Sequence, residues 1–171
     1  MNFKLVTIAA LVSLTSIAAI ADAVNINVTG NVVASPCVIN GGSANLNVDL
    51  GSTIQASALA SAGSTSSPVA LTLPITACPV GTSTVQVTFS GTPDPVAGAS
   101  YYKSTGTATN VAVGLYQASN GNLLGNGTSV TQTVQGDRTA SLAMQAKAYS
   151  SAGSVMPGTI NSVIVATMQD N

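Results

Sequence analysis

Apolar and polar residues alternate with a period of two along most of this chain. Successive side chains of a strand point to opposite faces, so this pattern is typical of β-strands with one buried face. Helical periodicity is scarce after the N-terminal apolar run. The alternation predicts strands over residues 24–33, 46–50, 69–73, 85–89, 111–115, 141–146 and 160–168.

Turn-forming residues separate these strands, because Gly, Pro, Asn and Asp favour tight reversals of the chain. They are Asn40-Gly41-Gly42, Pro79-Val80-Gly81, Pro93-Asp94-Pro95, Asn120-Gly121, Asn126-Gly127, Gly136-Asp137 and Pro157-Gly158. Residues 53–67 are rich in Ala and Ser and are expected to form a short helix or a loop. About seven or eight short strands with turns between them predict an all-β, antiparallel sandwich in a single domain.

The N-terminus reads as a secretory signal peptide: one Lys, then an uncharged apolar run, then small residues. Cleavage is expected after Ala21, and Ala23 is a second candidate. A membrane anchor is the alternative, but the run is short for a span and contains Ser and Thr.

The two cysteines, Cys37 and Cys78, follow the signal segment. In an oxidising compartment they are expected to form one intramolecular disulfide; free thiols or an intermolecular bridge are the alternatives. Their spacing is not that of a CxxC redox motif, and a chain without His offers a poor zinc site.

The composition argues against several functions. Four basic and five acidic residues leave a net charge of −1, which gives no electrostatic footprint for nucleic acid. Such a low net charge favours association of the protein with other chains.

The residues for catalysis or metal binding are also missing. Without His there is no Ser–His–Asp triad, and the acidic residues are not spaced as a glycosidase pair or a metal site. Asp49 and Asp137 fit turn or surface positions, and Tyr101 and Tyr102 fit a core or strand-edge role better than a sugar-stacking one. No enzymatic activity, cofactor, metal or small-molecule substrate is expected.

Residues 24–33 differ from the other strands because no turn follows within the stretch to fold it back as a hairpin. Val24, Ile26, Val28, Gly30 and Val32 share one face. The pattern alone leaves two interpretations open. The segment is either the first strand of the sandwich or an arm that fills a groove elsewhere.

The surroundings of both cysteines resemble the type 1-like fimbrial subunits of the chaperone–usher family. The resemblance lies in Val28-Thr-Gly-Asn-Val-Val-Ala-Ser-Pro-Cys37 and Leu71-Thr-Leu-Pro-Ile-Thr-Ala-Cys78-Pro-Val-Gly. Val87-Thr-Phe-Ser-Gly91, Tyr101-Tyr-Lys103 and Gly106-Thr-Ala-Thr-Asn110 follow in family order. Most similar are the small linker subunits of the tip fibre.

The resemblance implies an incomplete immunoglobulin-like β-sandwich that lacks its final strand and carries an N-terminal donor-strand extension. The expected organisation is a signal peptide over 1–21, a donor arm over 22–36 and a pilin domain over 37–171. The donor residues are Val24, Ile26, Val28, Gly30 and Val32. The chaperone-facing residues of the C-terminal strand are Ile160, Ile164, Ala166, Met168 and Asp170.

The expected partners are neighbouring pilus subunits through strand exchange, a periplasmic chaperone and an outer-membrane usher, on a route through the periplasm to a surface fimbrium. Asp170 departs from the family pattern, which has Tyr at this place. Two alternatives within the family are the major rod subunit and a carbohydrate-binding tip adhesin, although an adhesin needs an additional lectin domain. A secreted hydrolase or inhibitor is the alternative outside it.

Overall fold

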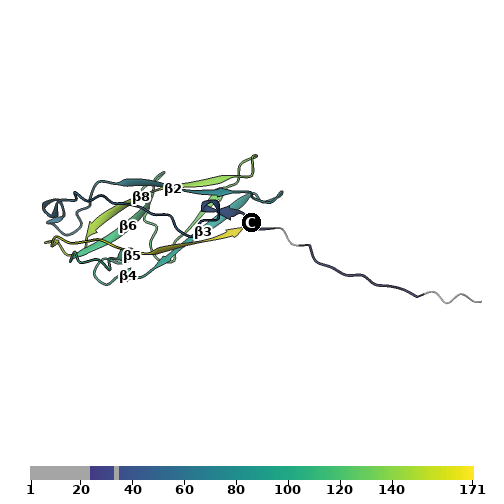
Figure 1. Ribbon diagram of the computed structural model, residues 1–171, viewed down its shortest axis with the longest axis horizontal. Coiled ribbons are helices and arrows are strands. Elements are labelled where there is room, and N and C mark those ends of the chain that lie inside the picture. The colour runs from purple at the N-terminus through teal and green to yellow at the C-terminus, as the bar shows by residue number, and fades with distance from the viewer. Residues whose placement is uncertain (1–23, 33–34) are drawn as a thin grey trace, which may run out of the picture. The chain divides into compact units, whose positions relative to one another are not determined.

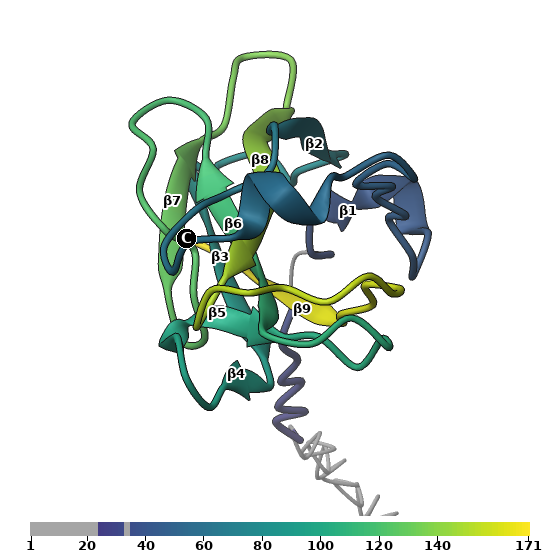
Figure 2. The ribbon, with the colours of Figure 1, turned by 90° about the vertical axis from the view of Figure 1, so that its left-hand side faces the viewer.

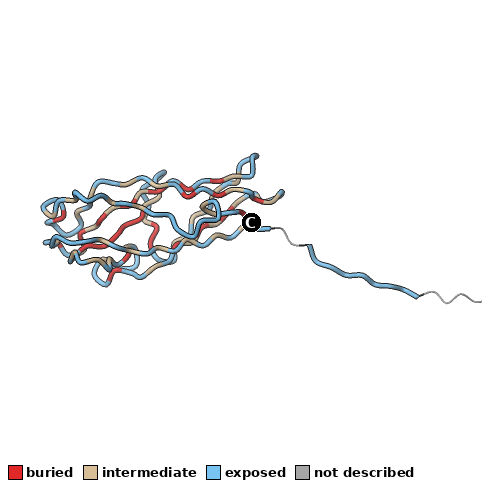
Figure 3. Tube along the Cα trace, viewed as in Figure 1, coloured by how far each residue is buried: buried red, intermediate tan, exposed pale blue. Residues whose placement is uncertain are grey.

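The computed structural model describes residues 24–32 and 35–171 (Figure 1). The chain divides into two compact units, Met1–Val32 and Val33–Asn171. In the first unit, residues 24–32 form no strand and are exposed throughout (Figure 3). The predicted signal peptide, residues 1–21, lies outside the described residues, as does part of the 22–36 arm.

The second unit contains two antiparallel sheets. The larger sheet has the order β1-β2-β8-β6-β5-β4, and Figure 2 shows β2, β8, β6, β5 and β4 following one another. Its strands are β1 (Val38–Ile39), β2 (Val69–Thr76), β8 (Ala140–Ser150), β6 (Val111–Gln117), β5 (Gly98–Lys103) and β4 (Pro93–Asp94). The smaller sheet has the order β7 (Ser129–Thr133), β3 (Thr84–Gly91), β9 (Ile164–Asp170).

Most of the predicted strands are present. The alternating segments at 69–73, 85–89, 111–115 and 141–146 are the centres of β2, β3, β6 and β8. The last strand begins at Ile164, later than predicted, because the residues before it are bonded to the loop between β5 and β6. The sequence did not predict the two-residue strands β1 and β4 or the longer β5 and β7, and residues 46–50 form no strand.

Two short 3-10 helices complete the described elements: η1 (Asn40–Gly42) and η2 (Ala56–Leu59). η2 lies within the segment predicted to hold a short helix or a loop. Asp49 and Asp137 have the turn roles expected of them, since their carboxylates accept hydrogen bonds from the main-chain N–H groups of Gly51 and Thr139. In residues 24–32 and 35–171, no helix is long and apolar enough to cross a bilayer.

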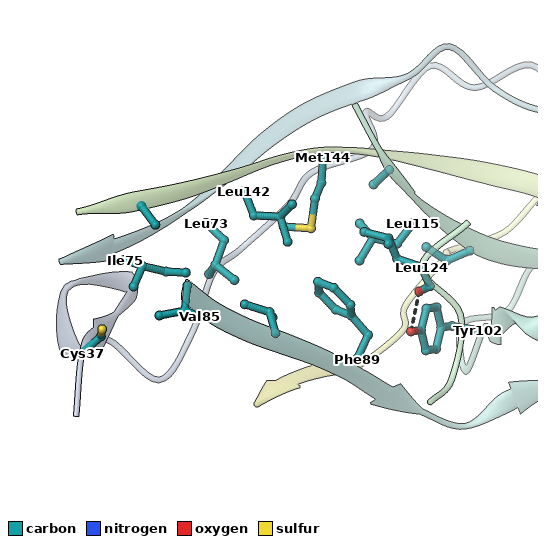
Figure 4. Close-up of a cluster of buried hydrophobic side chains, with 14 of the residues drawn as sticks. Cys37, Leu73, Ile75, Val85, Phe89, Tyr102, Leu115, Leu124, Leu142 and Met144 are labelled. Carbon is teal, nitrogen blue, oxygen red and sulfur yellow. Dashed lines mark hydrogen bonds between the residues drawn. The ribbon is translucent and has the colours of Figure 1, made fainter. Parts of the chain in front are cut away.

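The core lies between the two sheets (Figure 4). Alternate residues of β2, β8 and β6 face alternate residues of β3, so the period-two pattern of each strand becomes one continuous apolar layer. Tyr102 is fully buried in this layer, and its hydroxyl donates to the carbonyl of Leu124 at 2.7 Å. Burial raises the pKa of Tyr102 to about 12.

The predicted disulfide is confirmed, because Cys37 and Cys78 are bonded to each other and both belong to the core cluster. The bond joins the start of the domain, next to β1, to the loop that follows β2.

Candidate functional site

A long groove opens along the second unit, between residues 43–56 on one side and 155–166 on the other. Its volume is about 1290 Å³. Apolar side chains from both sheets form its floor: Leu71, Leu73, Phe89, Val113, Leu115, Met144 and Ala146. A groove of this size lined by core residues of a sandwich is a place where an element of the fold is missing.

The first wall of the groove, residues 43–56, keeps the alternation that predicted a strand at 46–50. Val48 and Leu50 pack against the core, and Leu46 is more exposed. Among the described residues, none forms a main-chain to main-chain hydrogen bond with residues 44–54. The strand prediction therefore failed at the level of pairing: the side-chain pattern is present, but no neighbouring strand lies beside it.

The second wall is formed by β9 and the residues that precede it. β9 pairs with β3 along one edge, with Ala166 opposite Phe89, and is the last strand of its sheet. Its exposure alternates, so that Ile164, Ala166 and Met168 pack against the core. Because β9 is the last strand of its sheet, its other edge is open and presents unpaired N–H and C=O groups.

Residues 157–161, upstream of β9, are held by the β5–β6 loop. The N–H groups of Thr105 and Ala108 donate to the carbonyls of Asn161 and Thr159, at 2.7 and 3.0 Å. Gly106 lies between them, and a Cβ atom at this position would overlap the carbonyl of Thr159. The close approach of the two segments thus requires glycine. It fixes this end of the second wall.

The residues predicted to face a chaperone lie in this wall. Ile164, Ala166, Met168 and Asp170 share one side of β9 and are partly buried. Ile160 also packs against the core, although it precedes the strand. Asp170, at the place where the family pattern has Tyr, accepts a hydrogen bond through Oδ2 from the main-chain N–H of Cys37 at 2.8 Å. Sequence reasoning noted the departure at Asp170 but not this role.

The predicted donor residues are exposed to solvent. Val24, Ile26, Val28 and Val32 are 82–100% exposed, and no heavy atom lies within 4 Å of a Cβ built at Gly30. Exposure of four aliphatic side chains on one face of a segment is unfavourable unless another surface covers them. The segment is therefore a candidate for strand addition.

The described residues contain no cluster of the side chains that usually hold a metal ion. No group of three or more His, Cys, Asp or Glu side chains comes together in residues 24–32 or 35–171. The site that the structure offers is an apolar groove between two unpaired stretches of backbone. Its chemistry is that of strand addition: main-chain hydrogen bonds along the edges and pockets for alternate side chains along the floor.

Comparison with known proteins agrees with this geometry. The family model described as "Fimbrial protein" matches residues 26–168. The chain is 40% identical to Protein FimG of Escherichia coli strain K12 over 163 residues, covering 94% of this chain and 92% of that protein. It is 32% identical to the fimbrial-like protein FimF of Salmonella typhimurium, covering 81% and 78%.

Among solved structures, the P pilus rod subunit PapA superposes with a TM-score of 0.65 at 21% identity, covering 80% of this chain and all of that one. At that identity, the likeness concerns the fold. Together with the family match, it confirms the predicted fold class, an incomplete immunoglobulin-like sandwich. The chain belongs to the fimbrial protein family and is a structural subunit of a bacterial surface fimbria.

Proposed function

We propose that this subunit polymerises by donor-strand complementation, with the arm of one subunit lying in the groove of the next. The donor residues are Val24, Ile26, Val28, Gly30 and Val32. The observation that carries this mechanism is the groove itself, whose two walls expose unpaired backbone over an apolar floor.

The arm and the groove have complementary properties. The arm offers aliphatic side chains at every second position, and the groove offers apolar residues that belong to the core. Gly30 shares the donor face, where the missing side chain permits close approach of the arm to the groove floor. An inserted strand would pair with β9 on one side and with residues 44–54 on the other.

Side-chain burial decides the stability of such a joint. Each ordered residue of the arm costs about 1–2 kcal/mol, and each ladder hydrogen bond returns about 0.5–1.5 kcal/mol. These two backbone contributions nearly cancel. Each buried aliphatic side chain adds about 1.5–3 kcal/mol, so the donor residues supply the net stabilisation.

The same groove needs cover before assembly, since an open apolar edge promotes aggregation. In this proposal a periplasmic chaperone supplies a strand that contacts Ile160, Ile164, Ala166 and Met168 during export. An outer-membrane usher then hosts the exchange for the arm of the next subunit. The organisation that follows is a signal peptide over 1–21, a donor arm over 22–36 and a pilin domain over 37–171.

We place the subunit at a minor, linker position of the fimbria. The resemblance of both cysteine regions to small tip-fibre linker subunits supports this position. The rod position and the tip-adhesin role remain alternatives, and binding of the purified subunit to neutral sugars on a glycan array would favour the adhesin.

Strand exchange can be tested directly. The chaperone-bound full chain is mixed with a synthetic peptide of residues 24–36, and release of the chaperone is followed by size-exclusion chromatography. The expected result is displacement by this peptide and none by a peptide of the same composition in scrambled order. Equal displacement by both peptides would contradict the mechanism, and so would a monomer whose own residues 24–33 occupy its groove permanently.

A further inference from the structure

Three tyrosines gather on the outer face of the larger sheet. Tyr101 is on β5, Tyr116 on β6 and Tyr149 on β8. Their chain neighbours Tyr102, Leu115 and Ala148 are buried, and side chains alternate along a strand, so the three tyrosines point away from the core. They lie on the side of the sheet opposite the groove, whose floor contains Leu115.

The three rings form one continuous surface. The centroids of the Tyr101 and Tyr149 rings are 3.9 Å apart with 20° between the ring planes, and the Lys147 ammonium lies 4.6 Å from the centroid of Tyr116. Gly114 provides the space for Tyr116, since a Cβ there would lie 2.7 Å from its ring. Tyr101, Tyr116, Tyr149 and Lys147 are called the tyrosine cluster below.

The larger sheet carries most of the scarce aromatic and cationic residues of the domain. Of the aromatic residues in the described chain, Phe89 and Tyr102 belong to the core, and the remaining three are in the cluster. Two of the three described Lys and Arg residues, Lys103 and Lys147, are on the strands of this sheet.

No carboxylate belongs to the strands that form this surface. The sequences of β2, β5, β6 and β8 contain neither Asp nor Glu. Asp94 on β4 is buried, and its Oδ1 accepts hydrogen bonds from the N–H groups of Val96 and Ala97. The surface is therefore cationic in a chain whose net charge is −1.

The tyrosines contribute hydrogen-bond donors. The pKa of Tyr101 is raised to about 12, chiefly by burial, and burial raises the pKa of Tyr149. Both phenols stay protonated at neutral pH, so each retains an O–H group that can donate a hydrogen bond. Cross-strand packing explains the stacked tyrosines, and the cation–π contact with Tyr116 explains the position of Lys147. Neither contact neutralises the positive charge of Lys147, which leaves its ammonium group able to bind an anion.

We propose that the tyrosine cluster binds an acidic carbohydrate, a glycan that carries hexuronic or sialic acid. The apolar face of a sugar ring packs on a phenol ring, and the sugar carboxylate accepts hydrogen bonds from Lys147 and a tyrosine hydroxyl. Because the cluster lies on the outer face of the sheet, this binding is independent of strand exchange in the groove.

The test measures retention of the full chain on three immobilised polymers. Polygalacturonate is an acidic carbohydrate, dextran is a neutral one, and polyglutamate is acidic without sugar. The expected result is retention on polygalacturonate at least about tenfold stronger than on either of the other two, because charge and ring stacking act together. Equal retention on dextran or on polyglutamate would overturn the proposal, the latter in favour of an acidic protein partner.

Variants locate the site. Lys147→Gln is expected to weaken retention on polygalacturonate by about tenfold, and Tyr149→Leu to weaken it with a smaller salt dependence. Arg138→Gln is the matched control, since it removes one positive charge from a turn outside the cluster. An equal loss for Arg138→Gln and Lys147→Gln would overturn the proposal. If Tyr149→Leu does not fold, the Lys147 comparison decides alone.

Discussion

The carboxylate of Asp170 lies 2.8 Å from the main-chain nitrogen of Cys37 and accepts its hydrogen bond. This contact ties the end of β9 to the first residue of the disulfide, across a separation of 133 residues. The next residue, Asn171, bonds through its main chain to Thr84. The C-terminal end of the groove wall is thus attached next to the disulfide.

Removing this contact should destabilise the domain. We expect Asp170→Ala to lower the free energy of unfolding by about 1–2 kcal/mol, because the N–H of Cys37 loses its acceptor. Asp170→Asn keeps an acceptor oxygen and should lose less. Urea unfolding measures both. Asp137→Ala, which removes a carboxylate that accepts a main-chain hydrogen bond in an exposed turn, is the control and should change stability by no more than about 0.5 kcal/mol.

Gly30 provides a test of the arm that leaves the fold untouched. We expect Gly30→Leu to abolish polymerisation, because a large side chain on the donor face prevents close approach to the groove. Its thermal unfolding should match that of the unmodified chain, since Gly30 lies in the exposed segment 24–32 and not in the folded sandwich. Asn31→Leu, on the opposite face of the same arm, should still form fibres in electron micrographs. Normal fibres from Gly30→Leu would contradict the arm model.

The second wall of the groove depends on Gly106. We expect Gly106→Ala to destabilise the domain by about 1–3 kcal/mol, because the added methyl group must push the carbonyl of Thr159 away. Gly136→Ala is the control, since no atom lies near its Cβ position. Guanidinium unfolding of the two variants gives the comparison, and equal stabilities would mean that the loop and the wall separate at little cost.

The disulfide should contribute much of the stability of the isolated subunit. Replacing both Cys37 and Cys78 by Ser is expected to cost about 4 kcal/mol, because the bond closes a loop with a sequence separation of 41. Thermal unfolding with and without reductant measures the loss. Reductant should lower the melting temperature of the unmodified chain and leave that of the double variant unchanged; a shift in the variant would point to another cause.

Tyr102 should make stability fall in alkaline solution. Its pKa is raised from 10.0 to about 12 by burial, so the folded state keeps a proton that the unfolded state releases. The contribution of the neutral Tyr102 phenol to the free energy of unfolding is complete below pH 10 and is lost as the pH rises from 10 to about 12. Tyr102→Phe should be less stable at pH 7, by about 1–2 kcal/mol, because the carbonyl of Leu124 loses its donor.

The pH dependence separates these two effects. Between pH 9 and 12 the melting temperature of Tyr102→Phe should fall less steeply than that of the unmodified chain. Tyr101 titrates in the same range, because its pKa is also about 12, so part of the alkaline loss should remain in the variant. Parallel curves for the two proteins would show that ionisation of Tyr102 does not destabilise the fold.

Local patterns in the sequence were enough for an all-β antiparallel sandwich, for five of the sheet strands and for the disulfide, whereas the missing final strand was implied only by the family resemblance. Val85, Val87 and Phe89 had to share a face because strand side chains alternate, and two cysteines in an exported chain had one simple pairing. β5 and β7 were not predicted because their short segments show little alternation of apolar residues. The period of the pattern thus determined the local conformation wherever one face was clearly apolar.

Pairing was decided only by the tertiary structure. The alternation at 46–50 resembles that at 69–73, yet only the second segment pairs with a neighbouring strand, β8, because hydrogen bonding of a strand depends on which segments come to lie beside it. For the same reason, no local signal could show that Asp170 meets Cys37, or that Tyr101, Tyr116 and Tyr149 from three strands share one surface. These contacts join residues that are distant in the chain, and only the packing of the two sheets brings them together.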